Sequence, residues 1–173
     1  MSFKTTLKNT IKLLWLDRQA IRDLSEDKLA IILGPAFIVL TALGAKQMDI
    51  MWGRVSTTLL IAGWLLFSVI AAAYVALISR ALGGKGRLVG QYRAYSLTYI
   101  TFISVLLIFV GIQLIWAYIA ISQQFAWWVG AIKAFVIFPF LLLPFLTAWK
   151  FIQTILVTAE VQEVRKLTAA AIV

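Results

Sequence analysis

"VSTTLLIAGWLLFSVIAAAYVALIS", Val55 to Ser79, contains no charged residue and decides the fold class. A bilayer core about 30 Å thick is crossed by roughly 20 apolar residues in a helix, so this run is long enough to span a membrane. Small residues, Ala71, Ala72, Ala73 and Ala76, give the helix a thin side, which is typical of closely packed membrane helices. The sequence therefore predicts a helical membrane protein.

Apolar runs of similar character recur on both sides of this stretch. Of the 173 residues, 62% are hydrophobic, whereas ordinary soluble domains contain about 45–50% apolar residues. We therefore expect an all-α, polytopic membrane protein in which residues 1–173 form a single membrane domain. The four expected transmembrane helices cover about 29–45, 55–79, 97–121 and 134–158.

The N-terminal segment, residues 2–22, is too interrupted by charge to cross a bilayer. At about 100° per residue, its apolar side chains fall on one face, with three lysines along the flank. These are the apolar Phe3, Leu7, Ile11, Leu14 and Ile21 and the basic Lys4, Lys8 and Lys12. The pattern predicts a basic amphipathic helix in the plane of the membrane interface, with Trp15 at headgroup depth. Packing on neighbouring spans of the same protein is the alternative.

The entry to the first span carries a candidate helix start. Ser25 is expected to cap a helix whose first turn holds Glu26 and Asp27, because carboxylates are favoured at a helix N-terminus. Pro35 lies inside the expected helix and predicts a kink there.

Basic residues are distributed unevenly over the segments between the spans. Six precede the first span, two lie in the first turn, four lie around the second turn and none lies in the third, residues 122–128. In order, these are Lys4, Lys8, Lys12, Arg18, Arg22 and Lys28; Lys46 and Arg54; and Arg80, Lys85, Arg87 and Arg93. Because cytoplasmic loops carry the excess of Lys and Arg, we expect both termini and the second turn in the cytoplasm, and a bacterial inner membrane as the location.

The second turn contains the glycine-rich sequence "LGGKGRLVG". It lacks the hydroxyl residue that follows the lysine in a Walker-type phosphate loop, and Val89 stands where a dinucleotide loop needs its third glycine. We instead expect glycines that permit positive φ in a tight turn, with basic side chains on lipid phosphate. The candidate cytoplasmic or lipid contact site consists of Gly83, Gly84, Lys85, Gly86, Arg87 and Arg93.

Reactive side chains are scarce in this chain. It has no cysteine, no histidine and seven carboxylates, which lie near the expected span ends. We therefore expect no enzymatic activity, cofactor or metal. Glu160 and Glu163, three residues apart, could bind a metal on one helix face, but a solvated charged face beside Arg165 and Lys166 is the expected arrangement.

The net charge of +9 raises the question of which negatively charged partner the protein contacts. The basic residues cluster at the ends of apolar runs, so we expect anionic lipid headgroups and no nucleic acid. A small transporter or channel, with Gln113, Lys133 and Lys150 along its path, is an alternative. For Lys150 we expect instead a snorkelling side chain with one hydrogen bond between helices.

Three stretches resemble the bacterial branch of the Yip-domain family of membrane proteins. They are "EDKLAIILGPAF" (Glu26–Phe37), "LGGKGRLVGQYRAYSLTYI" (Leu82–Ile100) and "WKFIQTILVTAEVQEVRKLTAAAIV" (Trp149–Val173). The family usually completes a fifth span after the segment similar to "KLTAAAIV". The resemblance therefore implies a four-span variant, or a C-terminal segment that packs without crossing.

Eukaryotic members of that family bind Rab-type GTPases and act in vesicle traffic. For a bacterial member the resemblance implies an integral membrane scaffold without catalytic residues. We therefore predict a non-enzymatic scaffold or adaptor that acts through contacts with lipids or another membrane protein. An accessory subunit of a larger membrane complex is the alternative.

Overall fold

The computed structural model describes residues 2–47, 56–104, 107, 111 and 128–173, without the side chains of 45, 47 and 128–143. Within these ranges all regular secondary structure is helical, which confirms the all-α class for the described part of the chain. The helices are α1 (Phe3–Leu13), α2 (Arg18–Glu26), α3 (Ala30–Gln47), α4 (Thr57–Ala81), α5 (Leu88–Leu97), α7 (Trp128–Gln162) and α8 (Lys166–Ile172).

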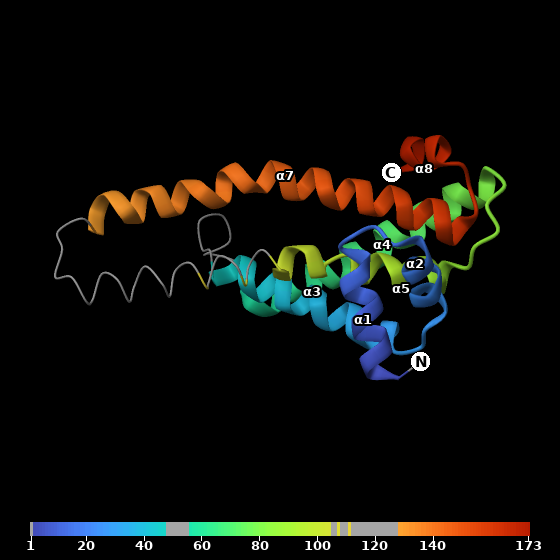
Figure 1. Cartoon of the computed structure of the whole chain (residues 1–173), viewed down its shortest axis with the longest axis horizontal. Helices are drawn as coiled ribbons and strands as arrows, with labels where there is room; N and C mark the ends of the chain where they lie inside the picture. Colours follow the sequence, from blue (N-terminus) through green and yellow to red (C-terminus); the bar gives the residue numbers. More distant parts are fainter. Residues whose placement is uncertain (1, 48–55, 105–106, 108–110, 112–127) are drawn as a thin grey trace.

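The helices form an elongated bundle (Figure 1). Helix α7 runs along the length of the molecule, and α3 follows the same direction. Helix α1 runs across that direction, and α2, α5 and α8 gather with it at one end. Both termini and the turn between α4 and α5 also lie towards this end, which we call the basic end.

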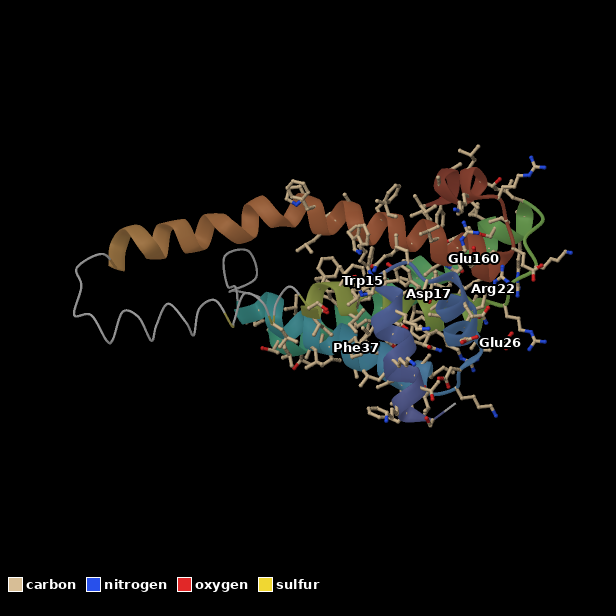
Figure 2. The ribbon with its side chains drawn as sticks, in the orientation of Figure 1. Trp15, Asp17, Arg22, Glu26, Phe37 and Glu160 are labelled. Atoms are coloured by element: carbon tan, nitrogen blue, oxygen red, sulfur yellow. The ribbon has the colours of Figure 1, made fainter. Side chains whose placement is uncertain are left out.

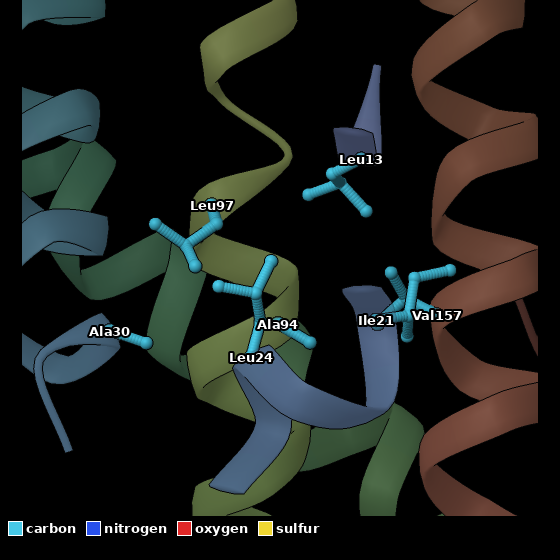
Figure 3. Packing of buried hydrophobic residues seen from close by; sticks show 7 residues of the cluster. All are labelled: Leu13, Ile21, Leu24, Ala30, Ala94, Leu97 and Val157. Atoms are coloured by element: carbon cyan, nitrogen blue, oxygen red, sulfur yellow. The ribbon is translucent and has the colours of Figure 1, made fainter. Parts of the chain in front are cut away.

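One hydrophobic cluster joins five helices at the basic end (Figure 3). Leu97 of α5 and Val157 of α7 are fully buried in it against residues of the N-terminal helices. The other members are Leu13, Ile21, Leu24, Ala30 and Ala94. Because each fully buried large aliphatic side chain contributes about 1.5–3 kcal/mol, this cluster fixes α1 and α2 on the longer helices.

A second cluster lies further along the bundle, where Ile38, Ala72, Tyr95 and Tyr99 are buried together. The Tyr99 ring meets Trp64 of α4 edge-on, with 5.9 Å between centroids. Aromatic pairs in this geometry contribute about 0.5–1.5 kcal/mol beyond their burial, so Tyr99 links α4 to the segment after α5.

Helix α4 is, among the described residues, the one helix long and apolar enough to cross a membrane by itself. Helix α2 and the stretch Ala30–Gly44, bent by 108°, pass the same test only as a pair. Large apolar side chains of α4 are exposed, namely Leu59, Leu66, Phe67, Val69, Ile70, Tyr74, Leu77 and Ile78. The expected span 55–79 thus coincides with a helix of suitable composition and an outward apolar surface.

The other expected spans match the helices to different degrees. Residues 29–45 correspond to α3, with Pro35 inside it, and 134–158 lie within α7. The expected span 97–121 is interrupted at its start, because α5 ends at Leu97, a turn follows, and helix resumes at Ile100. Most of the remaining residues of that span lie outside the described residues.

The N-terminal segment differs from the single expected helix over 2–22. Leu16 has a φ of 60°, in the left-handed region, and this breaks the segment into α1 and α2. Asp17 then starts α2, since its Oδ1 accepts the backbone N–H of Ala20 at 3.0 Å. The chain therefore turns a corner between the two helices.

The predicted helix start at Ser25 is wrong. Ser25 lies in the last turn of α2, and its hydroxyl donates to the Arg22 carbonyl at 2.7 Å. Asp27 caps the next turn instead, because its Oδ1 accepts the N–H of Leu29 at 3.0 Å. Ser and Asp are both good N-cap residues, so the sequence pattern alone does not tell whether Ser25 or Asp27 is the cap.

Candidate functional site

The glycine loop, residues 82–87, begins as a helix C-cap. Gly83 has a φ of 88°, and its N–H donates to the Arg80 carbonyl at 3.0 Å. The next N–H, of Gly84, donates to the Ser79 carbonyl at 2.8 Å. These two bonds form a Schellman motif, which satisfies the last carbonyls of α4. The expected positive φ is therefore confirmed at Gly83.

The other two glycines allow the loop to touch the end of α7. A Cβ at Gly84 would lie 2.8 Å from the Ser79 carbonyl oxygen and 3.1 Å from that of Gln162. A Cβ at Gly86 would collide with the Val161 carbonyl oxygen. Between them, the Lys85 N–H donates to the Gln162 carbonyl at 2.9 Å. The glycines therefore hold the loop against its own fold and do not form an open cradle for a ligand.

The two basic side chains of the loop project outward. Lys85 and Arg87 are exposed, as are the neighbouring Leu88 and Val89 at the start of α5. Arg80 braces the loop from the preceding helix, because its Nε donates to the Gly86 carbonyl at 3.2 Å. The loop thus presents two cations from a backbone that is held on both sides.

Arg93 has a different role from the loop residues with which it was grouped. Its Nη1 donates to the Ser25 and Glu26 carbonyls, at 3.3 and 3.1 Å. These carbonyls belong to the last turn of α2, where a cation also interacts favourably with the helix dipole. Arg93 is therefore a structural contact between α5 and α2, and its side chain is only half-exposed.

Buried amides connect α5 to α7 beside the loop. Gln91 Nε2 donates to Thr158 Oγ1 at 3.2 Å, and Gln162 Nε2 donates to Gln91 Oε1 at 3.3 Å. Further along the bundle, Gln153 accepts from Thr101 Oγ1 at 2.7 Å and donates to the Leu13 carbonyl at 3.3 Å. Since buried polar groups stabilise a fold only when paired, this network fixes how α7 is rotated against α5.

Lys150 occupies an aromatic cage on the same side of α7. Its Nζ lies 3.6 Å from the Tyr99 ring centroid, 4.9 Å from that of Tyr95 and 5.7 Å from that of Phe102. It also donates to Thr98 Oγ1, in the turn after α5. Among the described residues no carboxylate forms a salt bridge with Lys150. This geometry is suited to cation–π attraction, with one hydrogen bond beside it.

This geometry bears on one part of the expectation for Lys150. The hydrogen bond to Thr98 joins α7 to the turn after α5, which confirms the expected hydrogen bond between helices. The other residues of the hypothetical transport path are not placed, because Gln113 and the side chain of Lys133 lie outside the described residues.

Glu160 is an ion-pair partner and does not lie on a solvated face. Its side chain is 8% exposed, and its Oε2 accepts from Arg22 Nε and Nη2 at 3.0 and 2.9 Å (Figure 2). Arg18 Nε lies 3.4 Å from the other oxygen. Glu163 follows the end of α7 with a φ of 55°, so the two glutamates do not share a helix face. The expected solvated face is therefore wrong for Glu160, which ties α2 to α7.

Comparison with family models, with curated proteins and with solved structures finds no match for this chain. The resemblance to the Yip-domain family accordingly stays a prediction.

Apart from Lys150, the polar contacts of α7 were the main features that the sequence analysis missed. Gln153, Thr154, Thr158 and Gln162 recur at spacings of one and four residues in a mostly apolar helix. This spacing places them along one side of α7, and such a polar stripe indicates the side that faces other helices.

Proposed function

We propose that the protein is a non-enzymatic integral membrane scaffold that acts through contacts with another membrane protein. Its four spans cover about 29–45, 55–79, 97–121 and 134–158, and its basic end, with both termini, faces the cytoplasm of a bacterial cell. The outward apolar surface of α4 supports the embedding in lipid. The resemblance to the Yip-domain family belongs to this proposal as well.

The observation that carries the proposal is the way in which the glycine loop is held. Its backbone is bonded to the end of α7 and to α4, while Lys85 and Arg87 point outward. A loop that served phosphate chemistry would leave its backbone N–H groups directed at the ligand. Here the N–H groups of Gly83, Gly84 and Lys85 are bonded within the protein, which leaves two preorganised cations as a contact surface.

The experiment is purification in mild detergent from native membranes, followed by mass spectrometry of what remains bound. We expect Lys85→Glu with Arg87→Glu to release a membrane protein that copurifies with the native chain. The matched control, Lys28→Glu with Lys166→Glu, makes the same charge change at exposed positions outside the loop and should retain it. An equal release by both pairs of substitutions would contradict a contact at the loop.

An accessory subunit of a larger complex is a second form of the same proposal. A copurifying assembly of fixed stoichiometry would favour the subunit, whereas substoichiometric partners would favour the adaptor. Transport of a defined substrate in liposomes, abolished by Lys150→Met, would instead support the transporter and would overturn both forms.

A further inference from the structure

Helix α1 packs on the bundle through its polar side. Thr6, Asn9 and Thr10 are buried, although all three are polar. Thr6 Oγ1 donates to Asp27 Oδ2, and Asn9 Nδ2 donates to Asp23 Oδ2 at 3.2 Å. The helix is thus held to α2 and to the turn before α3 by hydrogen bonds.

The apolar stripe of α1 points outward. Phe3, Leu7 and Ile11 are 60%, 37% and 49% exposed, and Trp15, just beyond the helix, is 82% exposed. A helix of a soluble protein buries such a stripe, because apolar surface left in water costs about 25 cal/mol per Å². The medium outside α1 is therefore expected to be apolar.

A row of lysines borders this stripe. Lys4, Lys8 and Lys12 each follow one of the three apolar residues, so they occupy the neighbouring stripe about 100° around the helix. All three are exposed. Apolar side chains next to cations are typical of helices at the surface of anionic membranes.

The contacts of α1 also place it near the cytoplasmic ends of two expected spans, the first and the fourth. Thr6 contacts Asp27, three residues before α3 starts, and the carbonyl of Leu13 accepts from Gln153, near the cytoplasmic end of the expected fourth span. Helix α1 runs across the direction of α3 and α7 (Figure 1). A helix that runs across the spans at this level lies along the membrane surface.

We propose that α1 lies in the headgroup layer of the cytoplasmic leaflet, with Phe3, Leu7, Ile11 and Trp15 inserted and Lys4, Lys8 and Lys12 on the phosphates of anionic lipids. The inference rests on the proposed membrane-embedded arrangement. It selects the interfacial arrangement over packing inside the bundle, and it names an anionic phospholipid surface as the occupant of the exposed face.

The test uses the full chain, which has no native cysteine, in vesicles of phosphatidylcholine with or without phosphatidylglycerol. A fluorophore is attached to Leu7→Cys and, as the matched control, to Thr5→Cys, which is exposed outside the apolar stripe. Quenching by nitroxide on shallow lipid positions reports insertion, and quenching by iodide reports contact with water. We expect lipid quenching at position 7 and iodide quenching at position 5.

The lysines are tested in the same vesicles. We expect Lys4→Gln with Lys8→Gln to weaken insertion by about fivefold per lysine with phosphatidylglycerol present, because each cation near an anionic surface contributes about 1 kcal/mol. The charge-matched control, Arg165→Gln with Lys166→Gln, should leave the quenching at position 7 unchanged.

Two results would overturn the inference. One is equal iodide quenching at positions 5 and 7; the other is protection of position 7 from both quenchers, which would mean that protein covers the stripe. A fluorophore at Ile70→Cys, on the exposed side of α4, reports the embedding separately. If lipid nitroxide quenches the fluorophore at position 70 but not the one at position 7, only the proposed position of α1 is rejected. If lipid nitroxide does not quench at position 70 either, the proposal of a membrane-embedded protein is rejected.

Discussion

Gly86 is the residue at which the loop has least room for a side chain. Its missing Cβ would meet the carbonyl oxygen of Val161, which belongs to the backbone of α7 and cannot rotate away. We expect Gly86→Ala to lower the free energy of unfolding in detergent by about 1–3 kcal/mol, the usual cost of overpacking. Thermal or denaturant unfolding followed by circular dichroism measures this change.

Gly63 provides the matched control for that substitution. It lies in α4, and apart from its chain neighbours and the backbone of its own helix, no described atom lies within 4 Å of the position that an added methyl group would take. Gly63→Ala should therefore be neutral or stabilising by up to about 1 kcal/mol through helix propensity. Equal destabilisation by the two substitutions would mean that the contact of the loop with α7 is not what constrains Gly86.

Asp17 makes the start of α2 sensitive to acid. The N–H of Ala20, and to a lesser extent Lys12, hold the pKa of this carboxyl below its usual 3.8. The ionised cap therefore stabilises α2 above that pH, and the stabilisation is lost as the pH falls through the lowered pKa. We expect Asp17→Ala to lower the melting temperature at neutral pH and to differ progressively less from the native chain below pH 3.8.

Asp17→Asn separates the charge from the cap. An asparagine oxygen still accepts the N–H of Ala20, so this variant should stay closer to the native melting temperature at neutral pH than Asp17→Ala does. A difference between the native chain and Asp17→Ala that stays constant down to strongly acidic pH would argue against an ionised cap.

At the scale of single residues, the sequence predicted those conformations and contacts that depend only on residues nearby in the chain. The positive φ of Gly83 followed from its place after an apolar helix. The roles of Gly84 and Gly86 did not, because they depend on carbonyls of α7, far along the chain. Glu160 was misassigned for the same reason, since its partners Arg18 and Arg22 belong to α2.

At the scale of elements, the aromatic cage couples α7 to the turn after α5. Replacing Lys150 with methionine removes a cation–π attraction of about 2 kcal/mol, but it also removes a desolvation cost of several kcal/mol for a buried ion without a carboxylate partner. The second effect is larger. We therefore expect Lys150→Met to unfold with an equal or higher free energy than the native chain.

A double-mutant cycle isolates the cage itself. We expect Tyr99→Leu to destabilise the native chain by about 2 kcal/mol more than it destabilises the Lys150→Met variant, because the cation–π attraction is absent from the latter. The measurement is the free energy of unfolding of all four proteins in the same detergent. Additive effects of the two substitutions would show that the ammonium and the ring do not interact.

Helices that are marked by a long apolar run were predictable from the sequence. Helix boundaries that depend on a local break in the backbone were less predictable. Helix α4 and the expected span 55–79 agree closely because the run is long and free of charge. The break at Leu16 and the turn at Thr98 contain no proline or glycine, and the one signal at the first of them was Asp17, a good N-cap residue for α2. Periodicity found the apolar stripe of α1, but the hydrogen bonds of Thr6 and Asn9 decide which side is buried.

At the scale of the whole molecule, the segments of the basic end are expected to share one side of the membrane. Since the chain lacks cysteine, single-cysteine variants need no altered background. We expect a membrane-impermeant maleimide to label Lys85→Cys and Leu167→Cys only after permeabilisation. Ser122→Cys, in the third turn and outside the described residues, should be labelled in intact cells. Labelling of Lys85→Cys from outside would contradict the proposed topology.

The aromatic cage also bears on how the protein is made. Tyr95, Tyr99 and Phe102 precede Lys150 in the chain, so they leave the ribosome first. A lysine that enters the bilayer centre without a partner costs about 3 kcal/mol. Because its rings are already synthesised, Lys150 can exchange water for them without any later segment. The order of the chain thus lets α7 pack against α5 and the turn after it as soon as α7 is synthesised.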